Sequence, residues 1–197
     1  VYGTGSDSRP ILGAALDSCG SIFIAYNTLS GSVGGLTIDK STDKGETWNN
    51  SYNYYTSLGG GALAGKNVSP DIDLLDIATN IENQDHVAVG GRRTGNNGIL
   101  LYTIDHGVSW TELNINDPTV VKFSKLSSTL YYATIGAQSS TTYDVAIRSA
   151  SFNGTNYTGF ASLFSKTFTV GSIVVGTTPG VFDIDVAPNG STYAVLH

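Results

Sequence analysis

Two carboxylates occupy the same position in a repeated eight-residue pattern, which makes them the first candidates for chemistry in this chain. Residues 41–48 and 103–110 both read S/T-x-D-x-G-x-S/T-W, so Asp43 and Asp105 are equivalent. A carboxylate can transfer a proton, bind a metal ion or accept hydrogen bonds that close a turn. A lone carboxylate without acidic neighbours makes a poor metal site, so we expect the third role, with no metal and no cofactor.

The rest of the pattern favours a structural turn between two strands. A glycine tolerates positive φ, and an Asp side chain can accept hydrogen bonds from backbone N–H groups and hydroxyls a few residues further on. Each Trp is expected to bury a large ring against the neighbouring unit. The residues predicted to form the two turns are Ser41, Asp43, Gly45, Thr47, Trp48, Thr103, Asp105, Gly107, Ser109 and Trp110.

This pattern resembles the Asp-box, also called the BNR repeat, of sialidases, sortilin-type receptors and many secreted β-propellers. The resemblance implies a sialidase-like propeller fold in which the boxes lie away from the active site. The resemblance is clear in the first two units of the chain, and it implies a fold and not a reaction.

Strand-length apolar runs alternate with turn residues along the whole chain. We therefore predict an all-β, propeller-like repeat of four-stranded antiparallel blades, with about three and a half blades in this chain. The two Asp residues lie 62 positions apart, which suits one blade with long loops. The chain is interpreted as one domain, 1–197, with units at approximately 9–58, 70–117, 119–176 and 179–197. Because it has no Met and no signal peptide, it is expected to be processed or partial.

The third unit carries the weakest signal. Where a box belongs, residues 151–157 read SFNGTNY, in which Asn and Tyr replace Asp and Trp at a different spacing. The last strand of this unit is expected near Phe160–Phe164 or Phe168–Val175.

A half blade leaves strand edges open, and open edges promote aggregation unless something covers them. Three solutions stay open. Further blades can follow in a longer chain, Val1–Ser8 can supply an outer strand, or a neighbouring subunit can complete the sheet in a head-to-tail filament.

Composition excludes several classes of protein. With 24 Gly, 13% charged residues and a net charge of −6, the chain is turn-rich but not disordered. It has no basic patch, so we expect no nucleic-acid partner, and no apolar run long enough to span a membrane. Cys19 is its single cysteine, which excludes an internal disulfide; a buried or inert thiol is expected.

Asparagine sequons indicate the compartment. N-x-S/T occurs at Asn49, Asn67, Asn153, Asn156 and Asn189, all in predicted turns or strand ends. We interpret them as N-glycosylation sites of a secreted or cell-surface protein; the alternative is an ordinary Asn- and Ser/Thr-rich composition.

No catalytic set can be assigned. The sialidase resemblance implies three Arg residues on a substrate carboxylate, a Tyr nucleophile paired with Glu, and an Asp acid/base. The available arginines are Arg9, Arg92, Arg93 and Arg148. Arg9 lies in a stretch that faintly resembles the family's Arg-Ile-Pro motif but lacks its Ile. No Tyr–Glu pairing follows from the spacing, and the three histidines show no metal-ligand spacing.

The leading hypothesis is a secreted, non-catalytic structural or interaction glycoprotein that self-assembles through open blade edges, as a homo-oligomer or filament. The alternatives are a fragment of a sialidase-like glycoside hydrolase and a lectin-like propeller with a carbohydrate or protein ligand. Tyr52, Tyr54 and Tyr55 can stack on sugars, although alternating Tyr residues on an outer strand more often pack.

Overall fold

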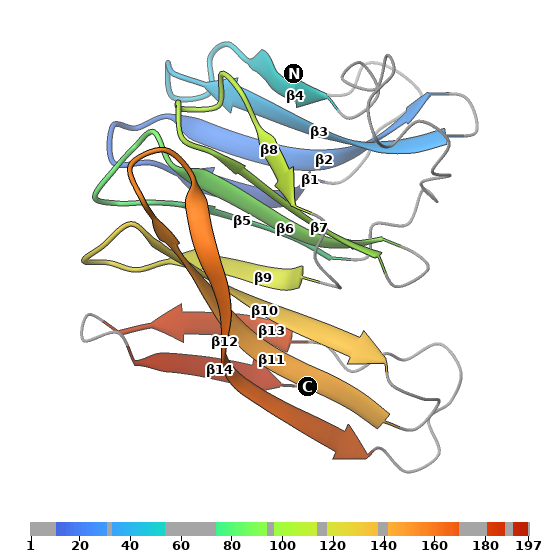
Figure 1. Ribbon diagram of the computed structural model, residues 1–197. Helices are drawn as coiled ribbons and strands as arrows, with labels where there is room; N and C mark the ends of the chain where they lie inside the picture. Colours follow the sequence, from blue (N-terminus) through green and yellow to red (C-terminus); the bar gives the residue numbers. More distant parts are fainter. Residues whose placement is uncertain are drawn as a thin grey trace.

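The protein is a stack of antiparallel β-sheets that follow one another along the chain (Figure 1). The computed structural model describes residues 11–30, 33–53, 74–93, 97–113, 118–137, 142–169, 181–187 and 191–196. These residues form strands and turns and contain no helix, so none of the described segments is a candidate membrane-spanning helix. The predicted all-β class is confirmed.

The first sheet contains four strands in sequence order: β1 (Ile11–Leu16), β2 (Ile22–Ser30), β3 (Val33–Ser41) and β4 (Asn49–Asn53). Side chains alternate between the two faces of each strand. Phe23 and Ala25 of β2 and Ile38 of β3 therefore share one buried face.

The second sheet repeats this order with β5 (Leu74–Thr79), β6 (Val87–Arg93), β7 (Asn97–Thr103) and β8 (Thr111–Leu113). Its two faces are both apolar. Val87 and Val89 face the first sheet, whereas Ala88 and Leu100 face the third. A strand that is buried on both faces loses the simple apolar–polar alternation of a half-exposed strand.

The third sheet is built from β9 (Pro118–Phe123), β10 (Thr129–Ala137), β11 (Thr142–Phe152) and β12 (Tyr157–Thr169). The fourth contains β13 (Val181–Val186) and β14 (Thr192–Leu196). The described chain thus has three four-stranded antiparallel units and a half unit, as predicted.

The first strands of successive sheets lie side by side. β1 packs beside β5, β5 beside β9, and β9 beside β13. Two apolar clusters fill the spaces between sheets. One joins the first and second sheets around Phe23 and Leu101, and the other joins the second and third around Leu100 and Tyr132. Burial of this apolar surface is the main force that holds the sheets together.

The third unit differs from the prediction in its last hairpin. Residues 153–156 form a tight turn between β11 and β12, in which Asn153 Oδ1 accepts hydrogen bonds from the N–H groups of Thr155 and Asn156, both at 2.9 Å. A degenerate box is therefore the wrong description of this segment, because the turn is shorter than the box turns. The last strand was expected at 160–164 or at 168–175. Both segments overlap one long strand, β12, which is described as far as Thr169.

Gly90 of β6 lies close to β9 of the third sheet. A Cβ at this position would lie 2.7 Å from Val121 Cγ1 of β9. The absence of a side chain at Gly90 therefore allows β6 and β9 to pack in direct contact.

We predict that Gly90→Ala destabilises the protein by about 1–3 kcal/mol, because the added methyl group overpacks the contact with Val121. Chemical denaturation measures this change. A Val121→Ala change in the same chain should recover part of the loss, so that the two changes are strongly non-additive. Additive effects would show that Gly90 acts through backbone freedom and not through this contact.

Candidate functional site

The two repeated turns have the same hydrogen bonds. In the first, between β3 and β4, Asp43 accepts from the Thr47 N–H at 2.8 Å and from the Thr47 and Ser41 hydroxyls. The Ser41 oxygen accepts in turn from the Gly45 N–H at 2.8 Å. The second turn reproduces each contact, with Thr103, Asp105, Gly107 and Ser109 in the equivalent places.

Two successive residues in each turn have left-handed backbone conformations. φ is 61° at Lys44 and 92° at Gly45, and 58° at His106 and 82° at Gly107. This conformation suits glycine but is uncommon for Lys or His. It aims the side chain that follows the Asp away from the turn, and in the second turn that side chain meets the first sheet.

The box carboxylates are held ionised. Hydrogen bonds from Thr47 and Ser41 lower the pKa of Asp43 to about 2. Burial acts to raise the pKa of Asp105, but hydrogen bonds from Ser109, Thr103 and Val108 lower it overall. A carboxylate with such a low pKa and its oxygens held in turn hydrogen bonds is a weak general acid or base at neutral pH.

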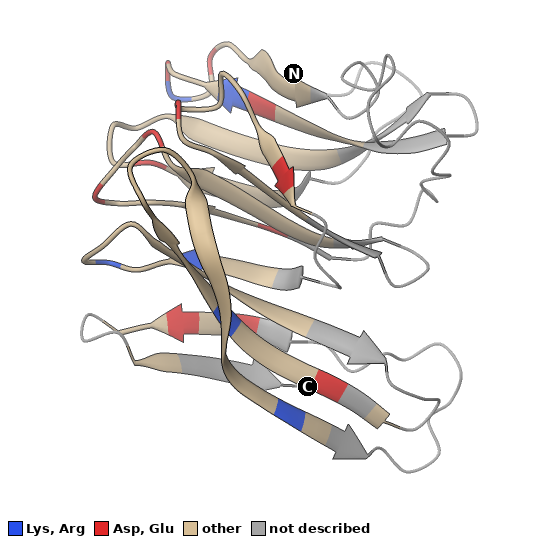
Figure 2. Cartoon of the chain, viewed as in Figure 1, with Lys and Arg blue, Asp and Glu red and all other residues tan. Residues whose placement is uncertain are grey.

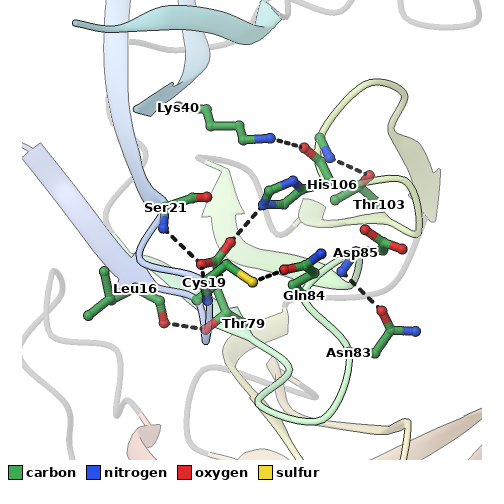
Figure 3. Close-up of polar contacts among 12 residues, drawn as sticks. Leu16, Cys19, Ser21, Lys40, Thr79, Asn83, Gln84, Asp85, Thr103 and His106 are labelled. Carbon is green, nitrogen blue, oxygen red and sulfur yellow. Dashed lines mark hydrogen bonds and ion pairs between the residues drawn. The ribbon is translucent and has the colours of Figure 1, made fainter. Parts of the chain in front are cut away.

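The second turn docks onto the first sheet through His106 (Figure 3). His106 Nε2 lies 2.6 Å from Oδ2 of Asp17, whose side chain is fully buried in the β1–β2 turn. Oδ1 of Asp17 accepts from the N–H groups of Ser21 and Cys19, at 2.8 and 2.9 Å. Burial acts to raise the pKa of Asp17, but these hydrogen bonds, with that of His106 the largest, lower it overall.

Further contacts fix the same junction. Lys40 Nζ donates to the His106 carbonyl at 2.8 Å and lies over the Phe23 ring. Thr79 of the second sheet donates to the Leu16 carbonyl of the first at 2.7 Å (Figure 3). Burial lowers the pKa of Lys40, and the Asp17, Asp85 and Asp105 carboxylates oppose that shift.

Trp110 and Gly107 meet Ser51 of the first sheet. The Ser51 hydroxyl donates to the Gly107 carbonyl at 2.6 Å and accepts from Trp110 Nε1 at 3.1 Å. The Trp110 ring packs on Tyr52 and on the first apolar cluster, as expected for a ring that contacts the neighbouring unit. Trp48 is half-buried and covers its own turn, where Nε1 donates to the Gly45 carbonyl at 3.0 Å.

A second junction joins the second and third sheets at the equivalent place. Asn80 follows β5 as Asp17 follows β1, and its N–H donates to the His86 carbonyl at 3.0 Å, as that of Asp17 does to Ser21. The Tyr157 hydroxyl, from the start of β12, lies 2.8 Å from His86 Nδ1. All three side chains are buried.

These junction residues were not identified from the sequence. Two signals were available. One was His106, which follows the second box Asp at a position to which the pattern assigns no role. The other was the similarity of the turns that follow the first strand of each unit. Sequence spacing does not show which turn of one sheet meets which turn of the next.

Cys19 was expected to be buried or inert, and the expected burial is wrong. The thiol is exposed in the β1–β2 turn, where its Sγ donates to Gln84 Oε1 of the second sheet (Figure 3). The backbone N–H of Cys19 donates to Asp17 Oδ1 at 2.9 Å and helps to close the turn.

Three of the five sequon asparagines are described, and all three are exposed: Asn49 at the start of β4, and Asn153 and Asn156 in the β11–β12 turn. Asn67 and Asn189 lie outside the described residues, as do Arg9, Val1–Ser8, Tyr54 and Tyr55. Tyr52 packs against the first cluster.

The described residues do not form a recognisable reaction centre. Arg92 and Arg93 end β6 and Arg148 lies in β11, and the Lys and Arg residues coloured in Figure 2 are dispersed over several strands and turns. Within the described ranges, no three His, Cys, Asp or Glu side chains come together as metal ligands. The His106–Asp17 pair has the geometry of an oriented imidazole, but no described Ser, Thr or Cys is hydrogen-bonded to its other ring nitrogen.

Comparison with known proteins gives the fold. No protein-family model and no curated protein sequence matches the chain. The crystal structure of the GH74 enzyme of Niastella koreensis is similar at a TM-score of 0.56 and 15% identity, over 94% of this chain and 26% of that enzyme. An α-L-arabinanase of Penicillium chrysogenum, solved with arabinobiose, aligns at a TM-score of 0.47 and 13% identity, over 95% of this chain and 57% of the enzyme.

The GH74 enzyme has a propeller fold. At 15% identity, the likeness to the GH74 enzyme shows the fold alone. This chain is accordingly a propeller-like array of about three and a half blades, and it spans about a quarter of the length of that enzyme.

We predict that Trp110→Ala costs about 3 kcal/mol of unfolding free energy, because it removes a large ring from the contact between two sheets. Ser51→Ala should cost about 1–2 kcal/mol, since it leaves two polar groups without that partner. Trp110→Phe combined with Ser51→Ala should cost less than the sum of Trp110→Phe alone and Ser51→Ala alone, measured by urea denaturation. Strict additivity would contradict the Trp110–Ser51 contact.

We predict a loss of stability between about pH 4 and about pH 2 that arises from the box carboxylates. Their folded-state pKa values lie below the unfolded value, so their contribution is present above about pH 4 and is lost as pH falls toward the folded pKa. Asp43→Asn and Asp105→Asn should flatten the pH dependence of the denaturation midpoint in this window. Glu46→Gln, which removes a charge from the first turn without removing those hydrogen bonds, is the control and should leave the slope unchanged.

Proposed function

We propose that this chain is part of an Asp-box β-propeller that acts outside the cell as a non-catalytic scaffold for interactions. The observation that carries this proposal is that the two repeated turn carboxylates, Asp43 and Asp105, accept hydrogen bonds that close their own turns. The same residue types recur at the same place, between the third and fourth strands of two successive sheets. That recurrence supports a role in building blades.

The polar junctions support the same role. Asp17 and His106 lie between sheets and are engaged with one another, and His86 and Tyr157 are buried between the next two. Side chains held in this way orient blades.

Exposure of three sequon asparagines supports a glycosylated, extracellular protein. Asn49, Asn153 and Asn156 have exposed side chains at a strand end and in a turn, where a bulky glycan can be accommodated.

Self-assembly through open edges is part of the proposal. Among the described strands, β14 pairs with β13 alone, whereas each of the other sheets has four strands. A strand added along β14, from another blade or another copy of the chain, would satisfy its open N–H and C=O groups.

A glycoside hydrolase is the second candidate, because the similar GH74 structure is an enzyme with the same fold. On this hypothesis the active site lies in another part of the propeller, and the described sheets support it. A lectin-like carbohydrate binder is the non-catalytic variant of the same idea.

The test uses the native full-length protein. We expect no turnover of a fluorogenic sialoside, of arabinan or of a panel of plant and bacterial polysaccharides, and we expect mass spectrometry after enzymatic deglycosylation to find Asp in place of Asn at the exposed sequons. Sedimentation analysis should show concentration-dependent assembly.

Turnover that survives Asp43→Asn and Asp105→Asn would contradict the scaffold proposal and would support a hydrolase whose active site lies away from the boxes. Turnover lost in these variants while folding is retained would contradict the structural role of the boxes. Binding on a glycan array without turnover would favour the lectin-like form.

A further inference from the structure

The junction between the second and third sheets contains a buried histidine whose two ring nitrogens both already have hydrogen-bond partners. His86 is 1% exposed, and its ring lies edge-on to Phe152 and Tyr157, with centroids 4.5 and 5.6 Å away. A buried imidazole is stable when it is neutral and when both ring nitrogens have suitable partners.

Hydrogen-bond partners fix the tautomer of His86. Asn83 Oδ1 accepts from the Asp85 N–H at 3.1 Å, which sets the orientation of the Asn83 amide. Its Nδ2 group, a donor, therefore faces His86 Nε2 at 3.2 Å. Nε2 must accept, so the proton is on Nδ1, which donates to the Tyr157 hydroxyl at 2.8 Å.

A proton added at Nε2 would point at the Asn83 N–H group. Two donors would then face each other, and a positive charge would be buried between two sheets. The added charge can be accommodated only if the Asn83 turn or the ring moves toward water.

We propose that the contact between the second and third sheets is a pH-sensitive joint, in which protonation of His86 releases the β11–β12 hairpin at Tyr157 from the β5–β6 turn. This inference is independent of the scaffold proposal, because it depends only on the contacts at His86.

The groups around His86 are consistent with opening at mildly acid pH. Its own turn contributes Glu82, Asp85 and the two asparagines, and β12 contributes Tyr157, which contacts Tyr102 of β7 and Phe123 of β9. Phe152 of β11 is apolar. Burial lowers the pKa of His86, and the Asp85 carboxylate opposes part of that shift.

The direction of the effect follows from these pKa values. The unfolded chain, with a His pKa near 6.5, takes up the proton before the closed junction does. The junction is therefore fully stable above about pH 6.5 and loses stability as pH falls from there toward the lower folded-state pKa.

Asn80 lies beside this contact. Its side chain is buried, and its Oδ1 accepts from the Glu82 N–H at 2.9 Å. Burial raises the pKa of the Tyr157 hydroxyl well above its usual range, and Asn80 opposes part of that shift.

Hydrogen–deuterium exchange on the full-length protein at pH 7.5, 6 and 5, corrected for intrinsic rates, tests this joint. We expect protection of amides in the β11–β12 hairpin and the β5–β6 turn to fall by up to about tenfold per pH unit below pH 6.5, the limit for one linked proton. The β2–β3 pair of the first sheet should retain its protection. His86→Gln should remove the pH dependence, whereas His106→Gln, at the other junction, should leave it.

NMR titration of the His86 ring in the wild-type protein provides a second measurement if His86→Gln fails to fold. The midpoint of the ring titration must match the midpoint of the exchange change. Protection of the hairpin that is equal at pH 5 and pH 7.5, a loss that persists in folded His86→Gln, or two different midpoints would overturn the joint.

Discussion

The structure depends on polar contacts that join the second sheet to the first hairpin turn of the first sheet, and the third sheet to the first hairpin turn of the second. His106 reaches Asp17 at the first junction, and Tyr157 reaches His86 at the second. Apolar packing is non-directional, so it draws sheets together without fixing how they are rotated or shifted. A buried polar contact is costly when it is unmade, and it therefore favours one arrangement of the two sheets.

The two junctions solve the same problem with different chemistry. The first joins an imidazole to a carboxylate that also accepts from backbone N–H groups. The second surrounds an imidazole with an amide donor, a hydroxyl and an aromatic ring. Successive sheets of one repeat are thus joined by different polar contacts.

Much of the fold was predictable because it is encoded locally. The strands follow from alternation and turn residues, and the box turns follow from an Asp, a Gly and a hydroxyl within seven positions. The prediction failed where local signals are weak. The 153–156 turn was interpreted as a degenerate box. Cys19 was expected to be buried or inert, and the burial was wrong because its exposure depends on where the second sheet lies. Trp48 and Trp110 occupy the same position in the repeat, yet Trp110 donates to Ser51 of the neighbouring sheet, whereas Trp48 donates to the Gly45 carbonyl of its own turn.

The sequence by itself determined the β class, the repeat and the turn chemistry of Asp43 and Asp105, since these depend on residues close together in the chain. The tertiary structure decided the partners of His106, His86 and Tyr157, and with them the order and orientation of the sheets. The physical reason is distance along the chain. His106 and Asp17 are 89 residues apart and His86 and Tyr157 are 71 apart, and no local propensity connects such pairs before the apolar faces between them have packed.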